Sequence, residues 1–266
     1  MPISCQLQVR CLTSEEFERV DYRVMGQAFA CQNDLGRLCE EGNYQRDLAA
    51  RLMAEGFRDV HSEVPITVTH RDFSKTYFVD LVVDDAVYEL KTVAALAGEH
   101  QAQLLNYLYL LGIHRGKLIN FRPPRVQGRI HATSLTPDDR RRVHFDAARW
   151  QDFSPACTTL RETMEALIAD WGAFLDFTLY QEALTHFLGG ASRVLQRLPL
   201  RRDSVPLGTQ AFHVQAPGAA FRVSAITEQI EATESHLRRL LALTDLQVLQ
   251  WINLDHATIK FVTITK

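Results

Sequence analysis

The stretch between residues 78 and 91 constrains the fold more than any other part of the chain, because it has the pattern of a β-hairpin. Val79–Val83 and Val87–Lys91 are rich in β-branched and apolar residues and have the length of strands. Asp84-Asp85 between them suits a tight turn, since Asp tolerates left-handed backbone angles and bonds its own backbone. We therefore expect two antiparallel strands joined by two residues.

A two-residue turn determines which side chains share a face of the hairpin. Asp80 then lies opposite Glu89, and Lys91 points to the same side because side chains alternate along a strand. Facing carboxylates repel each other, and partial burial raises the pKa of at least one of them. The other face is expected to pack into the core through Leu81, Val83, Tyr88 and Leu90.

A divalent metal ion between Asp80 and Glu89 would offset this repulsion. One or two carboxylates, completed by water and substrate phosphate, suit Mg²⁺ or Mn²⁺. Lys91 would lie beside the metal, where it can stabilise developing negative charge or position an attacking water. The alternative is a half-exposed hairpin with a solvated charged face, on which Lys91 neutralises Glu89. The spacing Asp-(x)8-Glu-x-Lys does not by itself decide between the two.

The bulk composition is typical of a soluble globular chain. Its 266 residues are 46% hydrophobic and 23% charged, with a net charge of −3. That charge argues against an overall basic field of the kind that attracts nucleic acid, although it leaves room for a local basic groove. The five cysteines lack CxxC spacing and indicate reduced thiols in a cytoplasmic protein. Residues 1–10 lack the apolar region of a signal peptide, and no apolar run approaches the roughly 18 residues of a membrane span.

Patterning around the hairpin predicts a mixed α/β domain over residues 1–135. Thr13 and Glu16 fit a capping box at the start of its first helix. A boundary is expected near residues 134–158, and a second domain over residues 136–266. Helices are expected at 13–33, about 41–55 and 101–111, and strands at 3–10, 61–68, 79–83, 87–91, 118–121 and 129–133.

Polar side chains on two of these helices flank the expected site. On the helix after the hairpin, His100, Gln103 and Tyr107 share one face, opposite a leucine stripe. On the second helix, Glu41 and Tyr44 are similarly spaced. Each set can simply face solvent. Glu41 can equally be a further metal ligand or a first-turn acid favoured by the helix dipole.

Several short motifs between residues 35 and 121 occur in an order and spacing that match a known family. The most specific are Glu-Leu-Lys at 89–91, His-x-Ala-Gln-Leu-Leu-Asn-Tyr-Leu at 100–108 and Leu-Ile-Asn-Phe at 118–121, accompanied by Glu41-x-x-Tyr44. Together they resemble the GxxExxY protein family, a bacterial branch of the PD-(D/E)XK nuclease superfamily, over about residues 15–133. The family's naming glycine falls on Leu38, so the turn before the second helix departs from the pattern.

The resemblance implies a restriction-endonuclease-like core, a mixed sheet flanked by helices, and hydrolysis of phosphodiester bonds in DNA or RNA with Mg²⁺ or Mn²⁺. It assigns the metal acids to Asp80 and Glu89 and the superfamily's lysine to Lys91. Glu41 matches the acid from the first core helix. The implied catalytic set is Asp80, Glu89, Lys91 and Gln103, with Glu41 as a third metal ligand and His100, Tyr107 and Tyr44 on the substrate side.

The second half of the chain repeats the pattern of the first after about 133 to 136 residues. Gly172 and Tyr180 echo Gly36 and Tyr44, for example. The carboxylates are missing, because Phe177 stands in place of Glu41 and the hairpin equivalent has no acid pair, so this half cannot hold Mg²⁺. We expect a degenerate second copy. It could replace a partner subunit in a monomer with pseudo-dimeric halves, and the sequence leaves the oligomeric state open. The alternative is an unrelated α/β accessory domain.

Two functions remain open at this stage. The first is a metal-dependent phosphodiesterase acting on DNA or RNA, which the intact acid and lysine set favours. The second is a non-catalytic relative that binds nucleic acid or protein, which the negative net charge and the acid-free second half favour. The chain shows no nucleophilic Ser or Cys–His pattern, P-loop or dinucleotide fingerprint.

Overall fold

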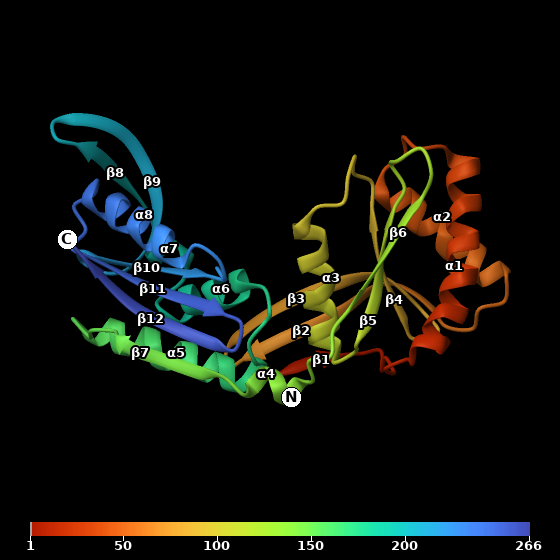
Figure 1. Cartoon of the computed structure of the whole chain (residues 1–266), viewed down its shortest axis with the longest axis horizontal. Coiled ribbons are helices and arrows are strands. Elements are labelled where there is room, and N and C mark those ends of the chain that lie inside the picture. Colours follow the sequence, from red (N-terminus) through yellow and green to blue (C-terminus); the bar gives the residue numbers. More distant parts are fainter. Residues whose placement is uncertain (1) are drawn as a thin grey trace. The chain divides into compact units, whose positions relative to one another are not determined.

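The computed structural model describes residues 2–266 and divides the chain into two compact units (Figure 1). Unit 1 contains the residues up to Thr69 and Ser74–Pro137, and unit 2 contains His70–Phe73 and Asp138–Lys266. Each unit is built on one six-stranded sheet that mixes parallel and antiparallel pairs and is flanked by helices. The expected α/β class is therefore confirmed.

Unit 1 follows the predicted order of elements, preceded by a short strand. Its sheet has the order β1-β2-β3-β4-β5-β6, in which β4 and β5 are parallel and are connected through α3. The elements are β1 (Ile3–Cys5), α1 (Ser14–Leu35), α2 (Glu41–Ala54), β2 (Val60–His70), β3 (Phe73–Val83), β4 (Ala86–Lys91), α3 (Gly98–Leu111), β5 (Arg115–Asn120) and β6 (Gln127–Ala132).

The β3–β4 hairpin has the register that a two-residue turn dictates. Leu81 pairs with Tyr88, and both turn residues, Asp84 and Asp85, have positive φ angles of 42° and 69°. The predicted inward-facing residues of both strands pack with α1 and α2 in one hydrophobic cluster. Because side chains alternate along β4, Glu89 and Lys91 lie on the opposite face of the sheet.

Helix α3 packs on that opposite face, against β5. A Cβ atom placed on Gly116 would lie 3.0 Å from terminal methyl groups of Leu104 and Leu108, so the glycine lets the helix approach the strand closely. This close packing brings the polar residues of α3 to the face that carries Glu89 and Lys91.

Some details of the helix predictions are wrong. Leu48, Leu52 and Met53 are expected on the apolar face of α2, but Met53 is 57% exposed. The buried stripe runs through Tyr44, Leu48 and Leu52 at helical spacing and leaves Met53 about 100° away around the axis. Helix α3 begins at Gly98, three residues before the predicted start. The first strand is confined to Ile3–Cys5, the part of the predicted 3–10 segment that pairs with β2.

Unit 2 repeats the strand connections of unit 1. Its sheet has the order β7-β12-β11-β10-β9-β8; β10 and β11 are parallel and are connected through α8, as β4 and β5 are through α3. The first strand differs, because β7 pairs with β12 whereas β1 pairs with β2. The elements are α4 (Pro137–Arg141), β7 (His144–Arg149), α5 (Pro155–Trp171), α6 (Phe177–Phe187), α7 (Ala191–Val194), β8 (Leu195–Arg202), β9 (Val205–Ala216), β10 (Ala219–Ser224), α8 (Ile230–Ala242), β11 (Val248–Asp255) and β12 (Thr258–Thr265).

Two side-chain contacts also recur in equivalent places. The hydroxyl of Tyr44 donates to the carbonyl of Gly36 at 2.8 Å, and that of Tyr180 donates to the carbonyl of Gly172 at 2.5 Å. In the same way, Asn120 at the end of β5 binds both backbone groups of Val93. In unit 2, Asn253 near the end of β11 forms the same two bonds with Ile226, which follows β10 as Val93 follows β4.

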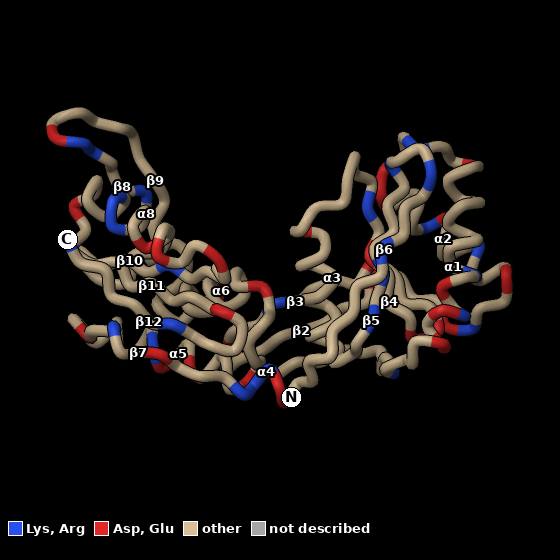
Figure 2. Tube along the Cα trace, viewed as in Figure 1, with Lys and Arg blue, Asp and Glu red and all other residues tan. Residues whose placement is uncertain are grey.

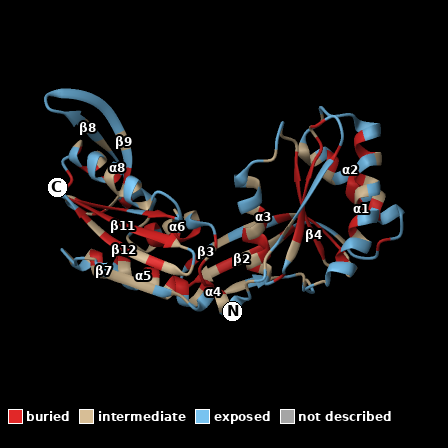
Figure 3. Cartoon of the chain, in the orientation of Figure 1, coloured by how far each residue is buried: buried red, intermediate tan, exposed pale blue. Residues whose placement is uncertain are grey.

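Burial and charge follow from this architecture. Buried residues are concentrated along β4 in unit 1 and along β11 and β12 in unit 2 (Figure 3). Acidic and basic residues are interspersed along both units (Figure 2). All five cysteines are free, and no helix within residues 2–266 has the length and apolar character needed to cross a membrane.

Candidate active site

Asp80 is held toward β4 by a backbone hydrogen bond. The strand pairing ends at Leu81 and Tyr88, and two residues beyond Tyr88 the Leu90 N–H donates to Oδ2 of Asp80 at 2.7 Å. This bond fixes the carboxylate beside the strand that carries Glu89. The predicted closeness of the two acids follows from that arrangement.

Glu89 and Lys91 form an ion pair almost out of contact with solvent. Nζ of Lys91 lies 2.6 Å from Oε1 of Glu89, and the two side chains are 11% and 1% exposed. The second carboxylate oxygen of Glu89, Oε2, is buried and has no hydrogen-bond partner within residues 2–266. A buried acceptor without a partner carries a desolvation penalty, so this oxygen is available to a ligand that the protein chain does not supply.

The two carboxyl groups have raised pKa values, as burial of a facing pair predicts. Burial raises the pKa of Asp80 to about 6, against the opposing effects of the Leu90 N–H and the Lys91 charge. Burial and the Asp80 charge raise the pKa of Glu89 to about 8, against the opposing effect of Lys91. Burial lowers the pKa of Lys91, but the nearby carboxylates outweigh it and the net direction is upward.

Two further acids lie near this group. Oε1 of Glu41, at the first position of α2, is 3.9 Å from Nζ of Lys91, and its side chain is 40% exposed. Glu63 on β2 has a φ of 52° and is close enough for its charge to raise the pKa of Asp80. Gln45 connects Glu63 to Asp80. Its Nε2 donates to Oε1 of Glu63 at 2.6 Å and to the Asp80 carbonyl at 2.7 Å.

Sequence reasoning singled out neither Gln45 nor Glu63. Gln45 follows Glu41 by four residues and so shares its face of α2, which is a signal that could have found it. Glu63 has no such signal, because its place depends on a left-handed backbone angle within a strand.

Helix α3 adds Gln103 and Tyr107. Nε2 of Gln103 donates to the hydroxyl of Tyr107 at 3.1 Å, and Tyr107 is only 6% exposed. Burial, followed by the charge of Glu89, raises the pKa of Tyr107 to about 12. The pair therefore lies beside the carboxylates, where it can direct a hydroxyl group toward a substrate.

The other two predicted substrate-side residues have structural roles. Nδ1 of His100 accepts the Ala97 N–H at 2.9 Å and so caps the N-terminus of α3. Tyr44 is fully buried and stacks on Phe121 with 4.5 Å between ring centroids. We therefore do not propose Tyr44 as a substrate contact.

The donor set fits a metal that keeps most of its water. Within residues 2–266, no group of three or more His, Cys, Asp or Glu residues is arranged to hold a metal ion. Mg²⁺ does not need such a group, since it commonly takes one or two carboxylates and completes its shell with water and substrate phosphate. Asp80 and Glu89, with the partnerless Oε2 of Glu89, fit that mode of binding.

Comparison with known proteins finds one family model that matches part of the chain. Residues 18–131 match the model of the PD-(D/E)XK nuclease superfamily, and this segment contains Asp80, Glu89 and Lys91. No curated protein and no solved structure matches the chain. Apart from His70–Phe73, the matched segment lies in unit 1, where a mixed sheet flanked by helices is consistent with a restriction-endonuclease-like fold.

Proposed function

We propose that unit 1 is a nuclease that hydrolyses phosphodiester bonds of DNA or RNA with Mg²⁺ or Mn²⁺. The observation that carries the proposal is the buried constellation of Asp80, Glu89 and Lys91 within the segment that matches the nuclease superfamily. A closer relationship to the GxxExxY branch is part of the same proposal, since Glu41 and Tyr44 keep its spacing.

Each residue of the constellation has a distinct task. Asp80 and Glu89 would hold the metal, and Glu41 would add a further carboxylate at the edge of the site. When bound, the metal supplies Lewis-acid stabilisation of the charge that develops on the phosphate. Lys91 donates a hydrogen bond to the attacking water or to the phosphate oxygen, and the charges of Glu89 and Asp80 keep its ammonium group protonated. Gln103 and Tyr107 orient the strand beside the scissile bond.

A second candidate function is binding without catalysis. It is favoured by the closed ion pair between Glu89 and Lys91 and by the missing three-residue metal cluster within residues 2–266. In that case the acids would serve a contact with nucleic acid or protein and would need no metal.

Cleavage of defined substrates separates the two candidates. Labelled single- and double-stranded DNA and RNA are incubated with wild type, Asp80→Asn and Glu99→Gln, with Mn²⁺ or with a chelator. Glu99, which is 82% exposed, is a matched acid outside the site. Metal-dependent products from wild type and Glu99→Gln, and none from Asp80→Asn, support the nuclease. Binding without products from any protein supports the second candidate.

The proposal also covers unit 2, which we interpret as a degenerate copy of unit 1. The repeated strand connections and the repeated Tyr–Gly and Asn–backbone hydrogen bonds support a duplication. A built-in second copy would replace the partner subunit that superfamily nucleases often use, and the chain would then act as a monomer.

A further inference from the structure

Unit 2 has a cavity at the place that corresponds to the candidate active site of unit 1. In unit 1, Glu89 on β4 pairs with Leu118 on β5. In unit 2, Arg222 on β10 pairs with Trp251 on β11 at the same step of the equivalent parallel pair. A cavity of about 180 Å³ is lined by Arg222 and by residues of α6, β9 and α8.

The first turn of α6 supplies the residues that correspond to those of α2. Phe177 begins α6 as Glu41 begins α2, and Gln181 corresponds to Gln45. The equivalent Tyr–Gly hydrogen bonds of the two helices confirm this alignment. Phe177 and Gln181 both line the cavity, so the site has kept its position while its chemistry has changed.

The pairing of β9 with β10 is offset by one residue relative to the pairing of β3 with β4. A register shift between Ala219 and Ala220 leaves one extra residue in β9, so His213 pairs with Phe221 and the next residue, Phe212, falls opposite Arg222, at the position that Asp80 occupies in unit 1. Phe212 and His213 both line the cavity, and no Asp or Glu does. The acid pair has therefore been replaced by an arginine and a phenylalanine, with a histidine next to them on β9.

This replacement reverses the charge of the site. Arg222 is exposed, and within residues 2–266 its guanidinium forms no hydrogen bond or ion pair. Burial and the Arg222 charge lower the pKa of the half-buried His213. Two side-chain amides, those of Gln181 and Gln210, complete the polar lining. An unpaired guanidinium with amide donors nearby is suited to bind an anion, above all a phosphate.

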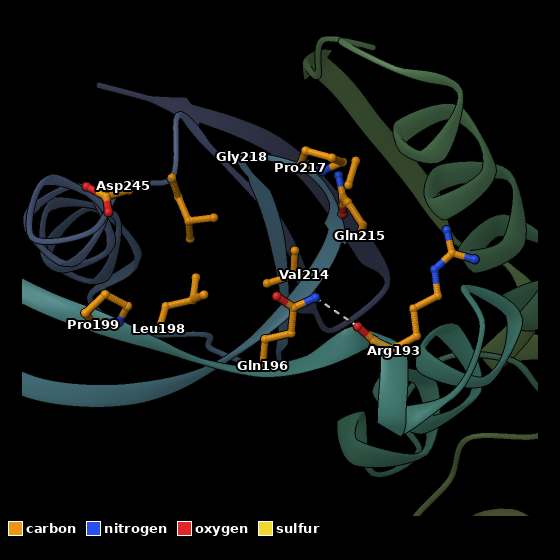
Figure 4. Close-up of a pocket in the computed structure, with 11 residues that line it drawn as sticks. Arg193, Gln196, Leu198, Pro199, Val214, Gln215, Pro217, Gly218 and Asp245 are labelled. Carbon is orange, nitrogen blue, oxygen red and sulfur yellow. Dashed lines mark hydrogen bonds between the residues drawn. The ribbon is translucent and has the colours of Figure 1, made fainter.

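The size of the cavity and its aromatic lining further limit the ligands that it can hold. A cavity of about 180 Å³ is smaller than the roughly 300 Å³ at which pockets begin to enclose drug-sized ligands, so it suits one phosphate group. Phe177 on its lining is 36% exposed and offers a ring face on which an unstacked base can rest. By contrast, the cavity of about 480 Å³ drawn in Figure 4 is lined by one arginine, Arg193, and one acid, Asp245, and has no net charge to select an anion.

We propose that the Arg222 cavity binds one backbone phosphate of a single-stranded nucleic acid, with the adjoining base on Phe177. The cavity itself indicates that the ligand is a phosphate group. That the phosphate belongs to a nucleic acid rests on the proposed function of unit 1. The degenerate copy then holds the strand and takes no part in cleavage.

The test measures strand binding by the full chain in the presence of a chelator, so that metal and cleavage play no part. The probe is a fluorescein-labelled single strand of about 12 nucleotides, within the usual site size of strand-binding folds. Arg222→Ala is compared with Arg202→Ala, another exposed arginine of unit 2 that does not line the cavity. Arg222→Glu is a second variant, and thermal unfolding checks that each protein is folded.

We expect Arg222→Ala to raise the Kd at least about tenfold, as for loss of a charge-assisted hydrogen bond, while Arg202→Ala stays near wild type. Inorganic phosphate should compete for the site in wild type, and Phe177→Ala should weaken binding of the strand but not of phosphate. Equal Kd values for the two arginine variants, or phosphate binding without strand binding, would overturn the proposal.

The outcome is separable from that of the proposed function. If Arg222-dependent binding occurs but no substrate is cleaved, the nuclease assignment fails while the phosphate site stands. If Asp80-dependent cleavage occurs but Arg222→Ala leaves the Kd unchanged, only the phosphate site fails.

Discussion

Nζ of Lys91 and Oε1 of Glu89 are 2.6 Å apart, in side chains that are 11% and 1% exposed. Burying two charges is costly, and their mutual attraction repays the desolvation only partly. A second carboxyl group, that of Asp80, lies close enough to raise the pKa of Glu89 further. Such an arrangement weakens stability and is what a metal-binding active site requires.

Loss of the Lys91 ammonium should therefore impair cleavage strongly. We expect Lys91→Met to lower the Mn²⁺-dependent rate at least about 100-fold, as for removal of one group that stabilises developing charge. Lys260→Met is the matched control, because it removes a lysine that pairs with Asp255 at 2.8 Å in unit 2. Similar rates for the two variants would remove Lys91 from the mechanism.

Glu41 should have a smaller effect than the buried acids. Its side chain is 40% exposed and lies 3.9 Å from Lys91, so it acts through water or from the edge of the site. We expect Glu41→Gln to slow cleavage roughly tenfold and to weaken Mn²⁺ binding to a similar degree, near 1.4 kcal/mol. Calorimetry and initial rates measure the two effects, and a Glu41→Gln enzyme as inactive as Asp80→Asn would place Glu41 among the principal ligands instead.

The pKa of Glu89 predicts how stability varies with pH when no metal is present. The pKa of Glu89 is raised from its ordinary 4.5 to about 8 in the folded state, so between these pH values the folded state binds more protons than the unfolded state. The free energy of unfolding should therefore fall as the pH rises through this window. In Glu89→Gln this decline should be shallower, and the decline that is left should come from Asp80, whose pKa is also raised.

Denaturant unfolding in the presence of a chelator, from about pH 5 to about pH 9, measures this decline. Glu99→Gln, an exposed acid in the same unit, should keep the wild-type slope. An unchanged slope in Glu89→Gln would show that Glu89 is ionised in the folded state at neutral pH.

The Tyr–Gly contacts predict equivalent losses of stability in the two units. Tyr44→Phe and Tyr180→Phe each remove one hydrogen bond to a glycine carbonyl, partly buried in unit 1 and buried in unit 2. Each should cost about 0.5 to 1.5 kcal/mol of unfolding free energy. Because Tyr44 is fully buried, Tyr44→Phe should leave the cleavage rate of the folded enzyme near that of wild type. A large loss of rate without a loss of stability would give Tyr44 a role at the site.

The hairpin was predictable because local chemistry determines it. Asp84 and Asp85 select a tight turn, the turn sets the register, and the register brings Asp80, Glu89 and Lys91 together. The capping box of Thr13 and Glu16 is equally local and is present as predicted.

Contacts between distant segments could not be derived in this way. Gln45 reaches the Asp80 carbonyl on β3 from α2, and nothing in the sequence around either residue predicts that bond. The bulge that shifts β9 by one residue likewise depends on how three strands of unit 2 pair. Sequence spacing alone therefore did not show that Phe212 falls opposite Arg222, at the position of Asp80.

The claim that Asp80 and Glu89 form a divalent-metal site is tested most directly by calorimetric titration of Mn²⁺ into wild type and into Asp80→Asn/Glu89→Gln. A short, non-cleavable oligonucleotide analogue is included so that phosphate can complete the metal's shell. The account predicts saturable binding to wild type that is lost in the folded double variant. Identical titrations of the two proteins, or no binding to wild type even with the oligonucleotide present, would contradict it.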